Sequence, residues 1–579
     1  HRLTEPLFDT PRFVKNLEKA YHRIWELFLN KELPQTIEIK EKPDPAPIIR
    51  YPASVREEIL RACSLHQAGQ IEQAEDIYNK ILKQYPDQPD ALHLMGVIYH
   101  QKGDFSAAIR LISQAIARVP GDWLYHNNLG AAYRHSYQLD LSLSCYRKAV
   151  EIKRDFAEGY YNIGIILNEQ EKAEESVFYY EKAIDIRADY DEAVCTLLHQ
   201  LQLMCDWKKI DRLSIRSRTM LENAANGKNI NALMPFVGVI CEDQPALAYA
   251  IAKSWSDRVS AQMSQIRRKA VTRGGRRNAE DKRIRIGYLS ADFRNHPVAS
   301  QMINFFKLHN RTEFEIFCYS FGTNDGSHYR QHIEKDCDVF SDMQNIGYAD
   351  AADRIIEDGI DILVDLMGHT NDNKLQIFAL RPAPIQITWL GFPGTTGASF
   401  FDYIITDKTV TPLERAPFYS EKFAYLPYTY MVNDYQLGIS DRLWKRPDFG
   451  LPNPTPAPSQ EGNAFVFCSF NRSYKIEPIM FDLWMKLLKA VPGSVLWLRR
   501  VSDISEKNLK QAAEERGISG TRLIFTDKLP TKEEHIARHQ LADLALDTRI
   551  YNGHATTNDA LWAGVPVITL EGGHFASRA

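Results

Sequence analysis

Polar residues that suit anion binding stand in one short stretch, "NGHATTNDALWAG", which spans residues 552–564. The preceding residues, 544–548, form an apolar run typical of a buried strand, and the residues that follow have the pattern of a helix. His554, Thr556 and Thr557 therefore lie near a helix N-terminus, where unpaired backbone N–H groups and the helix dipole attract anions. Threonine hydroxyls add donors to a phosphate. Ordinary capping of the helix by Asn552 or a threonine explains the same residues equally well.

Five further loops place polar side chains directly after a predicted strand. They are "ADFRNHPVAS" with His296, "MGHT" with His369, "GFPGTTG", "NRSYKIEP" with Lys475, and "DKLPTKEEH" with Lys532 and His535. In open α/β sheets, ligands bind beyond the carboxyl ends of the strands. One such histidine or lysine is more often structural or solvated, but six loops at equivalent strand ends indicate a site.

The chemistry that suits these residues is transfer of a group from a nucleotide diphosphate. A leaving diphosphate needs positive charge and N–H donors where negative charge grows. Lys475 and the helix N-terminus at 554–557 supply both, and Asp559 is placed to accept hydrogen bonds from ribose hydroxyls, although a solvent-facing helix residue is the alternative. No DxD pair lies on a candidate loop, and no Cys/His cluster has zinc-ligand spacing. We therefore expect no metal and no other cofactor.

Short β-rich runs alternate with helical segments from residue 283 onward, which predicts parallel sheets covered by helices on both faces. The first series of strands is 283–290, 314–320, 360–366, 385–390 and 402–407. The second series is 465–470, 494–500, 522–527, 544–548 and 565–570. We expect two doubly wound domains facing each other, at residues 281–435 and 464–579, joined by a loop rich in proline, aspartate and glycine at 436–463.

A 34-residue repeat precedes these domains. Gly96, Gly130 and Gly164 follow one another at this spacing, which matches the tetratricopeptide repeat. About four repeats over residues 55–200 must stack into a curved solenoid, because one repeat cannot bury its own apolar face. The concave surface of such a solenoid binds proteins or peptides, and an array that only spaces or dimerises other domains is the alternative. Asn128 and Asn162 occupy the same position of successive repeats, where asparagines either clamp an acceptor backbone or pack helices.

The composition excludes several other classes of function. The 579 residues carry a net charge of only −4, so no overall field marks a partner for nucleic acid or an anionic membrane. Residues 201–280 are predicted as a helical linker region whose basic stretch, 267–283, lacks interleaved aromatics. Eight scattered cysteines indicate a reducing, cytoplasmic setting. No apolar run approaches the roughly 18 residues of a membrane span.

Four long motifs resemble the O-linked N-acetylglucosamine transferase family. They are "GYLSADFRNHP", "RPAPIQITWLGFPGTTG", "FNRSYKIEP" and "YNGHATTNDALWAGVPV", and they follow tetratricopeptide repeats as in that family. The resemblance runs from about residue 55 to the C-terminus. It implies an α-solenoid followed by a GT-B fold of two Rossmann-like halves. It also implies inverting, metal-independent transfer of N-acetylglucosamine from UDP to serine or threonine of proteins, with the repeats holding the acceptor.

The resemblance also implies roles for residues at the matching motif positions. Lys475 would neutralise the diphosphate, and Asp559 would hold the ribose. The UDP site would be lined by His554, Ala555 and Thr556, and the uridine would be flanked by Lys532, His535 and Arg538. His296 would face the acceptor and the sugar as a candidate general base, although the donor's own phosphate is the alternative base. We also count His369 among the candidate catalytic residues. Arg472 and Ala555 depart from the residues that the family often carries there.

Two other functions stay open at this point. A SPINDLY-type protein O-fucosyltransferase that uses GDP-fucose is favoured by "GHTNDNKL", whereas "KEEH" and "NGHATTND" favour the N-acetylglucosamine branch. Because the second domain holds the nucleotide, we favour UDP-N-acetylglucosamine. A non-catalytic repeat scaffold with a truncated transferase relic is the second alternative. We leave a homo-oligomer open.

The two ends of the chain carry a further expectation. Residues 1–45, beginning "HRLTEPLFDTPRF", resemble the family's C-terminal tail, and the family continues beyond "GGHFASRA". We therefore expect a fragment of a tandem array or a permuted protein, although a helix that caps the solenoid explains residues 8–30 as well. The second Rossmann-like half would then be incomplete, which exposes an apolar edge. We expect weak or no activity from this chain alone.

Overall fold

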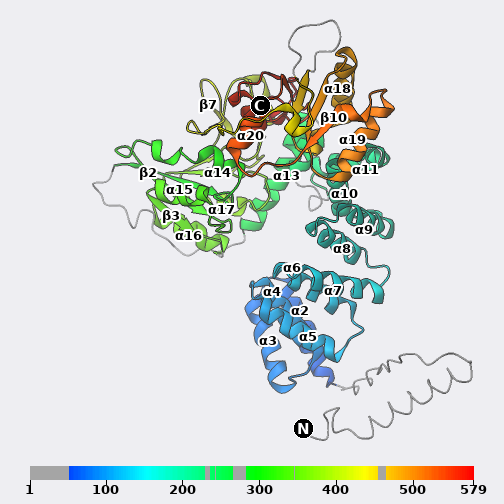
Figure 1. The fold of residues 1–579 in the computed structure, drawn as a ribbon. Coiled ribbons are helices and arrows are strands. Elements are labelled where there is room, and N and C mark those ends of the chain that lie inside the picture. Colours follow the sequence, from blue (N-terminus) through cyan, green and yellow to red (C-terminus); the bar gives the residue numbers. More distant parts are fainter. Residues whose placement is uncertain (1–50, 229–234, 242, 265–281, 345, 454–464) are drawn as a thin grey trace, which may run out of the picture. The chain divides into compact units, whose positions relative to one another are not determined.

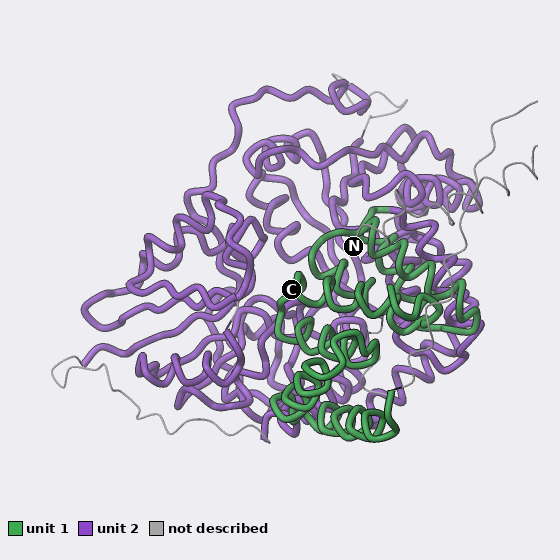
Figure 2. Tube along the Cα trace, turned by 90° about the horizontal axis from the view of Figure 1, so that it is seen from below, with its two compact units in different colours: residues 1–171 green, residues 172–579 purple. Residues whose placement is uncertain are grey.

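The computed structural model describes residues 51–228, 235–241, 243–264, 282–344, 346–453 and 465–579. The chain forms two compact units, residues 1–171 and 172–579, which Figure 2 shows in green and purple. The predicted helical segment at 1–45 lies outside the described residues, as does most of the basic stretch at 267–283.

Unit 1 is a series of antiparallel helix pairs (Figure 1). Its described helices are α2 (Ala53–Gln67), α3 (Ile71–Gln84), α4 (Pro89–Gln101), α5 (Phe105–Arg118), α6 (Trp123–His135), α7 (Leu139–Ile152) and α8 (Ala157–Glu169). Asp104 and Asp122 cap α5 and α6 by accepting backbone N–H groups. The repeated glycines allow close packing, because a Cβ on Gly96 would lie 2.6 Å from Ile112.

Unit 2 begins with helices that lead into the α/β region. They are α9 (Ala173–Ile186), α10 (Asp191–Leu203), α11 (Trp207–Ala225), α12 (Pro235–Cys241) and α13 (Pro245–Ser264). The helix α10 approaches the second half of this region, where Ser473 Oγ donates to the Leu203 carbonyl at 2.6 Å. The helix α13 approaches the first half, where Ser256 Oγ donates to the Thr396 carbonyl at 2.7 Å. These helices therefore contact both halves.

The first half contains a seven-stranded parallel sheet in the order β3-β2-β1-β4-β5-β6-β7. Its strands are β1 (Ile284–Ser290), β2 (Phe314–Ser320), β3 (Val339–Asp342), β4 (Ile362–Asp365), β5 (Ile385–Thr388), β6 (Tyr403–Thr406) and β7 (Lys422–Tyr425). The helices between them are α14 (Pro297–Met302), α15 (His328–Asp336), α16 (Tyr348–Glu357) and α17 (Leu375–Ala379), with the 3₁₀ turns η1 (Phe306–Leu308) and η2 (Leu413–Phe418).

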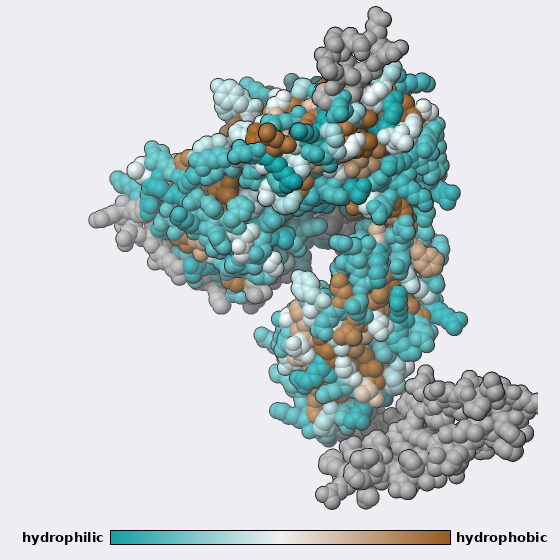
Figure 3. Space-filling view, in the orientation of Figure 1, coloured by the Kyte–Doolittle hydropathy of each residue, from teal (hydrophilic) through white to brown (hydrophobic). Residues whose placement is uncertain are grey.

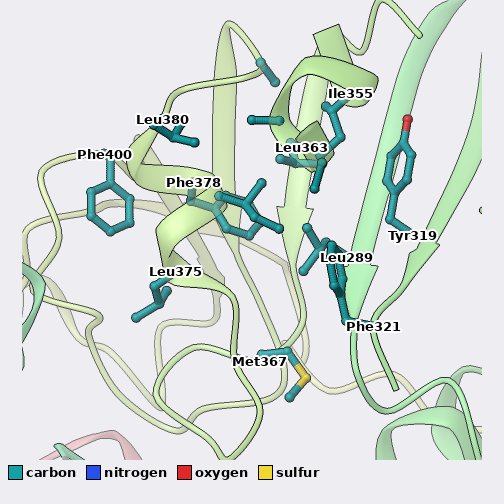
Figure 4. Packing of buried hydrophobic residues seen from close by; sticks show 14 of the residues in the cluster. Leu289, Tyr319, Phe321, Ile355, Leu363, Met367, Leu375, Phe378, Leu380 and Phe400 are labelled. Atoms are coloured by element: carbon teal, nitrogen blue, oxygen red, sulfur yellow. The ribbon is translucent and has the colours of Figure 1, made fainter. Parts of the chain in front are cut away.

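Helices cover both faces of this sheet. Figure 4 shows one of the two cores, in which Leu289 and Leu363 of the central strands pack with Ile355 of α16 and Phe378 of α17. The alternate strand residues, Tyr288 among them, point to the other face and pack with α14. This alternation explains why the central strands have almost continuous apolar sequences.

The second half contains a five-stranded parallel sheet in the order β10-β9-β8-β11-β12. Its strands are β8 (Val466–Ser469), β9 (Val495–Arg499), β10 (Leu523–Thr526), β11 (Leu544–Leu546) and β12 (Val567–Ile568). The helices are α18 (Pro478–Ala490), α19 (Asp503–Glu515), α20 (Lys532–His539) and α21 (Ala555–Trp562). The 3₁₀ turns are η3 (Arg446–Phe449), η4 (Ser473–Lys475), η5 (Gly520–Arg522) and η6 (Phe575–Ser577). The described residues thus form an α-solenoid followed by two Rossmann-like halves, which confirms the predicted fold class.

All ten predicted strands are present, with ends that differ by a few residues. Two strands, β3 and β7, were not predicted. Each lies at an edge of the first sheet, and the residues of each are at most partly buried. An edge strand needs no continuous apolar run, because one of its sides has no neighbouring strand.

Hydrophilic residues cover most of the face drawn in Figure 3, with smaller hydrophobic areas between them. None of the helices in the described part of the chain combines the length and the hydropathy needed to cross a membrane.

Candidate active site

The strand orders show where a ligand would bind in each half. In both sheets the first strand lies between the second and the fourth, so the direction of winding reverses beside it. Side chains beyond the carboxyl ends of the two strands at such a reversal line a crevice. His296 follows β1 and His369 follows β4, whereas Lys475 follows β8 and His554 follows β11. The predicted residues therefore stand at the two switch points.

Lys475 is the central cation of the second switch point. Its Nζ donates to the Asn552 carbonyl at 2.6 Å and lies 3.9 Å from the ring centroid of Tyr551. Burial lowers the pKa of Lys475 to about 7, with the charge of Asp547 opposing this shift and that of Arg472 adding to it. An anion in this position would restore the protonated form, because opposite charge favours ionisation.

The N-terminus of α21 lies beside Lys475. His554 is its N-cap residue and has a φ of 51°, which is uncommon for a residue with a side chain. The first-turn N–H groups of a helix have no partner within it, although that of Thr556 is bonded to the Gly553 carbonyl at 3.1 Å. Ala555 begins the helix and adds no side-chain donor. Such a turn could bind an anion through its backbone dipoles.

The His554 ring is held on both sides. Nε2 lies 3.3 Å from the Ala576 carbonyl, so it carries the hydrogen, and Nδ1 accepts from the hydroxyl of Tyr430 at 2.9 Å. Burial, with the charge of Lys475, lowers the pKa of His554 to about 3. The ring is therefore neutral at pH 7 and orients the loop. Tyr430 belongs to the segment after β7, so this bond also joins the two halves.

A second cluster lies on α20 and α21. Lys532 Nζ is 2.5 Å from Asp559 Oδ2, and His535 Nε2 is 3.6 Å from the same oxygen. Burial raises the pKa of Asp559 above its ordinary value, although the charge and hydrogen bond of the neighbouring Lys532 oppose this shift. Burial also lowers the pKa of His535 well below its ordinary value. The structure thus brings together three of the residues predicted for the nucleoside end.

Arg538 is buried behind this cluster. Its Nη1 donates to the Asp527 carbonyl at 2.6 Å, and its guanidinium lies 4.5 Å from the ring centroid of Phe470. Burial lowers the pKa of Arg538 to about 10, so it stays charged at pH 7. The role of Arg538 beside the uridine stays a prediction.

Sequence reasoning missed Asp547, the buried carboxylate at the end of β11. Asp547 Oδ1 accepts from the Thr548 N–H at 2.8 Å and Oδ2 from Thr569 Oγ1 at 3.0 Å. It lines a small cavity with Ser469, Asn471 and Thr557. Within the described part of the chain, no hydrogen-bond partner reaches Ser469 Oγ or Asn471 Oδ1. An aspartate directly after an apolar strand in "LALDT" was the signal available for it.

His296 lies at the first switch point and caps α14. Its Nδ1 is 3.3 Å from Asp292 Oδ2, and burial lowers the pKa of His296 to about 4, with the charges of Arg294 and Arg472 adding to the shift. Burial also raises the pKa of Asp292 to about 6. The charge of Arg472 also contributes to the lowered pKa values of both His296 and Lys475, so its guanidinium is within electrostatic range of both residues.

His369 stands at the first switch point, but its side chain is enclosed by the protein. Its side chain is 1% exposed, and its Nε2 is 2.7 Å from the Thr396 carbonyl, which Ser256 also contacts. Burial lowers the pKa of His369 to about 4. Because the neutral ring is enclosed by the protein, it holds the "GFPGTTG" turn. These contacts support a structural role for His369, and the catalytic role predicted from the sequence stays a prediction.

The two predicted acceptor residues of unit 1 belong to a chain of side-chain hydrogen bonds. Asn162 Nδ2 donates to Asn127 Oδ1 at 3.1 Å, and Asn127 donates to Asn128 Oδ1 at 3.1 Å. Asn128 Nδ2 donates in turn to Nε2 of the buried His93 at 2.8 Å. The asparagines are partly buried, and each retains amide capacity beyond these bonds.

Among the described residues, no group of three or more histidine, cysteine, aspartate or glutamate side chains could hold a metal ion. The absence of a metal from the reaction stays a prediction.

The sequence matches the profile of "Glycosyl transferase family 41" over residues 204–447 and 453–579. The chain belongs to glycosyl transferase family 41. Residues 65–132, 125–156 and 157–190 match tetratricopeptide repeats, which confirms the predicted repeats. The family match includes every candidate residue of the α/β region and leaves Asn128 and Asn162 to the repeats.

Two curated relatives show how this member of family 41 compares with others. It is 38% identical over 392 residues to "Probable UDP-N-acetylglucosamine–peptide N-acetylglucosaminyltransferase SEC" of Arabidopsis thaliana, covering 66% of this chain and 39% of that protein. It is 33% identical over 296 residues to the SPINDLY protein of the same plant, covering 50% of this chain and 31% of that protein. The chain thus spans about two fifths or less of the length of these relatives.

One solved structure is similar to this chain over most of the length of both proteins. A mutant of the Thermobaculum terrenum O-GlcNAc transferase matches this family 41 chain with a TM-score of 0.55 and 28% sequence identity. The match covers 85% of this chain and 84% of that one. The GT-B arrangement predicted from the sequence is therefore shared with an O-GlcNAc transferase.

Proposed function

We propose that this chain is a protein O-glycosyltransferase that transfers N-acetylglucosamine from UDP-N-acetylglucosamine to serine or threonine, with inversion and without a metal. The observation that carries the proposal is the convergence of Lys475 with the N-terminus of α21 at the second switch point. The names of the SEC relative and of the Thermobaculum terrenum protein support the same donor. The eight free cysteines support a reducing compartment such as the cytoplasm.

The second half would bind the donor in two parts. Lys475 and the first-turn N–H groups of α21 would hold the diphosphate, and the cluster of Lys532, His535 and Asp559 would hold the nucleoside. The diphosphate gains negative charge as the bond to the sugar breaks, so donors aimed at it stabilise the transition state more than the ground state. The pKa of Lys475 rises when the anion binds, which keeps the side chain cationic during the reaction.

The first half would activate the acceptor. Nδ1 of His296 lies 3.3 Å from Asp292 Oδ2 and accepts from the Val298 N–H at 3.4 Å. For Nε2 to take a proton from the acceptor hydroxyl, the neutral ring would carry its hydrogen on Nδ1 and donate it to Asp292 in place of the capping bond. The ring is neutral at pH 7, as a proton acceptor must be, since its pKa is lowered to about 4. Asp292 would then stabilise the imidazolium that forms. In the repeats, the amide groups of Asn128 and Asn162 would contact the backbone of the acceptor protein.

Calorimetric titration with UDP tests the donor site without an acceptor. We expect micromolar binding to the unchanged chain and its loss in Lys475→Ala, because the diphosphate loses its central cation. Lys486→Ala is the matched control, since this exposed lysine lies on α18, outside the site. A folded chain that binds no UDP would overturn the proposal.

Competition between nucleotides tests the donor itself. UDP should displace a labelled UDP-sugar far better than GDP does. Stronger displacement by GDP would contradict the choice of UDP and would favour the fucosyltransferase alternative.

A further inference from the structure

Asp243 lies in the helical linker region, and its carboxylate accepts hydrogen bonds from a loop about 330 residues further along the chain. It precedes α13, and its Oδ1 and Oδ2 accept from the N–H of Gly573 at 2.8 and 2.9 Å. Oδ1 also accepts from the His574 N–H at 3.2 Å and from Ser577 Oγ at 2.7 Å. One carboxylate thus organises the whole turn after β12.

Two glycines permit this close approach. A Cβ on Gly572 would lie 2.2 Å from Ser577 Oγ and 2.9 Å from Asp243 Oδ2. A Cβ on Gly573 would lie 3.1 Å from the Asp243 carbonyl oxygen. Both distances to Asp243 leave little or no room for a side chain, so the "GGH" sequence matches the carboxylate that it surrounds.

The same turn contacts the loop that carries the proposed diphosphate site. The Ala576 carbonyl accepts from the Asn552 N–H at 2.7 Å and from His554 Nε2 at 3.3 Å. The carbonyl of Asn552 in turn receives Lys475 Nζ at 2.6 Å. Asp243 is therefore connected to Lys475 by hydrogen bonds through the 572–577 turn and the backbone of Asn552. Asp243 itself belongs to neither Rossmann-like half.

The helix that follows Asp243 is fixed to the first half as well. Besides the bond from Ser256 to the Thr396 carbonyl, Gly397 packs directly on the backbone of α13, because a Cβ there would lie 2.2 Å from the Lys253 nitrogen. The position of Asp243 is thus defined by the first half, and its bonds extend to the second.

We propose that Asp243 is a positioning residue for the diphosphate end of the donor site. It holds the 572–577 turn so that the Ala576 carbonyl fixes the Asn552 backbone and the hydrogen of His554 on Nε2, and these in turn place Lys475 and the start of α21. This inference rests on the proposed function, because it assumes that a nucleoside diphosphate binds there. The nucleoside end is held by the separate contacts of Lys532, His535 and Asp559.

Replacing the carboxylate of Asp243 by an amide tests the diphosphate end of the donor site separately from the nucleoside end. Asp243→Asn keeps the shape but turns an NH₂ group toward N–H and O–H donors, so part of the turn loses its acceptor. We expect the affinity for UDP to fall about tenfold, as for loss of a charged hydrogen bond, and the affinity for uridine to stay within twofold. Calorimetry for UDP and ligand-observed NMR for uridine give the two values. Asp257→Asn is the matched control, because Asp257 is an exposed residue of α13 that pairs with Lys253.

Three outcomes would overturn the inference. Unchanged UDP affinity would show that the carboxylate does not position the site, and equal losses for UDP and uridine would show only a general structural role. Absence of UDP binding to the unchanged chain would instead overturn the proposed function and the inference with it. If Asp243→Asn does not fold, Ser577→Ala tests the same network by removing one bond, with an expected loss of about threefold for UDP only.

Discussion

The two Rossmann-like halves carry predicted residues at equivalent places, yet they use them differently. After β4 of the first half, His369 is enclosed by protein and bonded to Thr396. After β8 of the second half, Lys475 is only partly buried, and among the described residues its Nζ donates a hydrogen bond to a backbone carbonyl alone. A switch point thus indicates where a ligand binds, whereas burial and partners decide which side chains can contact it.

The comparison predicts its largest effect for Lys475. Lys475→Met should lower the transfer rate by about 10²–10³-fold, as for loss of one preorganised donor to the transition state, and leave the melting temperature equal or higher. An assay of sugar transfer to acceptor protein, with thermal unfolding beside it, measures both. A comparable loss in Lys486→Ala would contradict a specific role for this lysine.

His369 should show the opposite pattern. His369→Leu should cost about 1–2 kcal/mol of unfolding free energy, because a buried hydrogen bond is lost, with UDP affinity unchanged within twofold. His369→Gln, whose amide can still donate to Thr396, should recover part of the stability. Denaturant unfolding and calorimetry check the pair of variants. Normal stability with abolished transfer would support the predicted catalytic role of His369 instead.

Asp559 tests whether the second half has two separable ends. Asp559→Asn should weaken the binding of uridine about fivefold, because the ribose loses a charged acceptor and Lys532 loses its partner. Unlike Asp243→Asn, it should weaken uridine and UDP by similar factors. Parallel titrations with both ligands measure these affinities. An effect on UDP alone would contradict the division into a diphosphate end and a nucleoside end.

A further prediction for Lys475 is a pH dependence of the stability of the empty protein. The pKa of Lys475 is lowered to about 7 in the folded chain from its ordinary 10.5, so between these values the unfolded state binds more protons. Stability should therefore rise with pH across this window, and the contribution should be absent in Lys475→Met. Melting temperatures of both proteins from pH 6 to 10 should converge at the alkaline end. A constant difference would contradict the lowered pKa.

Much of the fold could be predicted because its signals are local. The 34-residue spacing of Gly96, Gly130 and Gly164 identified the repeats, and apolar runs identified ten strands. The residues after β8 and β11 could be placed at one sheet edge because parallel strands end on the same side. The edge strands β3 and β7 were not predicted, because partly exposed strands lack continuous apolar runs.

The local pattern of the chain was sufficient for the repeats, the two sheets and the loops that carry Lys475 and His554, because these depend on periodicity and on neighbours in sequence. Only the tertiary structure decided that His369 is enclosed, that His554 carries its hydrogen on Nε2, and that Asp243 holds the turn beside the proposed diphosphate site. Burial and hydrogen-bond partners come from segments up to hundreds of residues away, and no local pattern contains them.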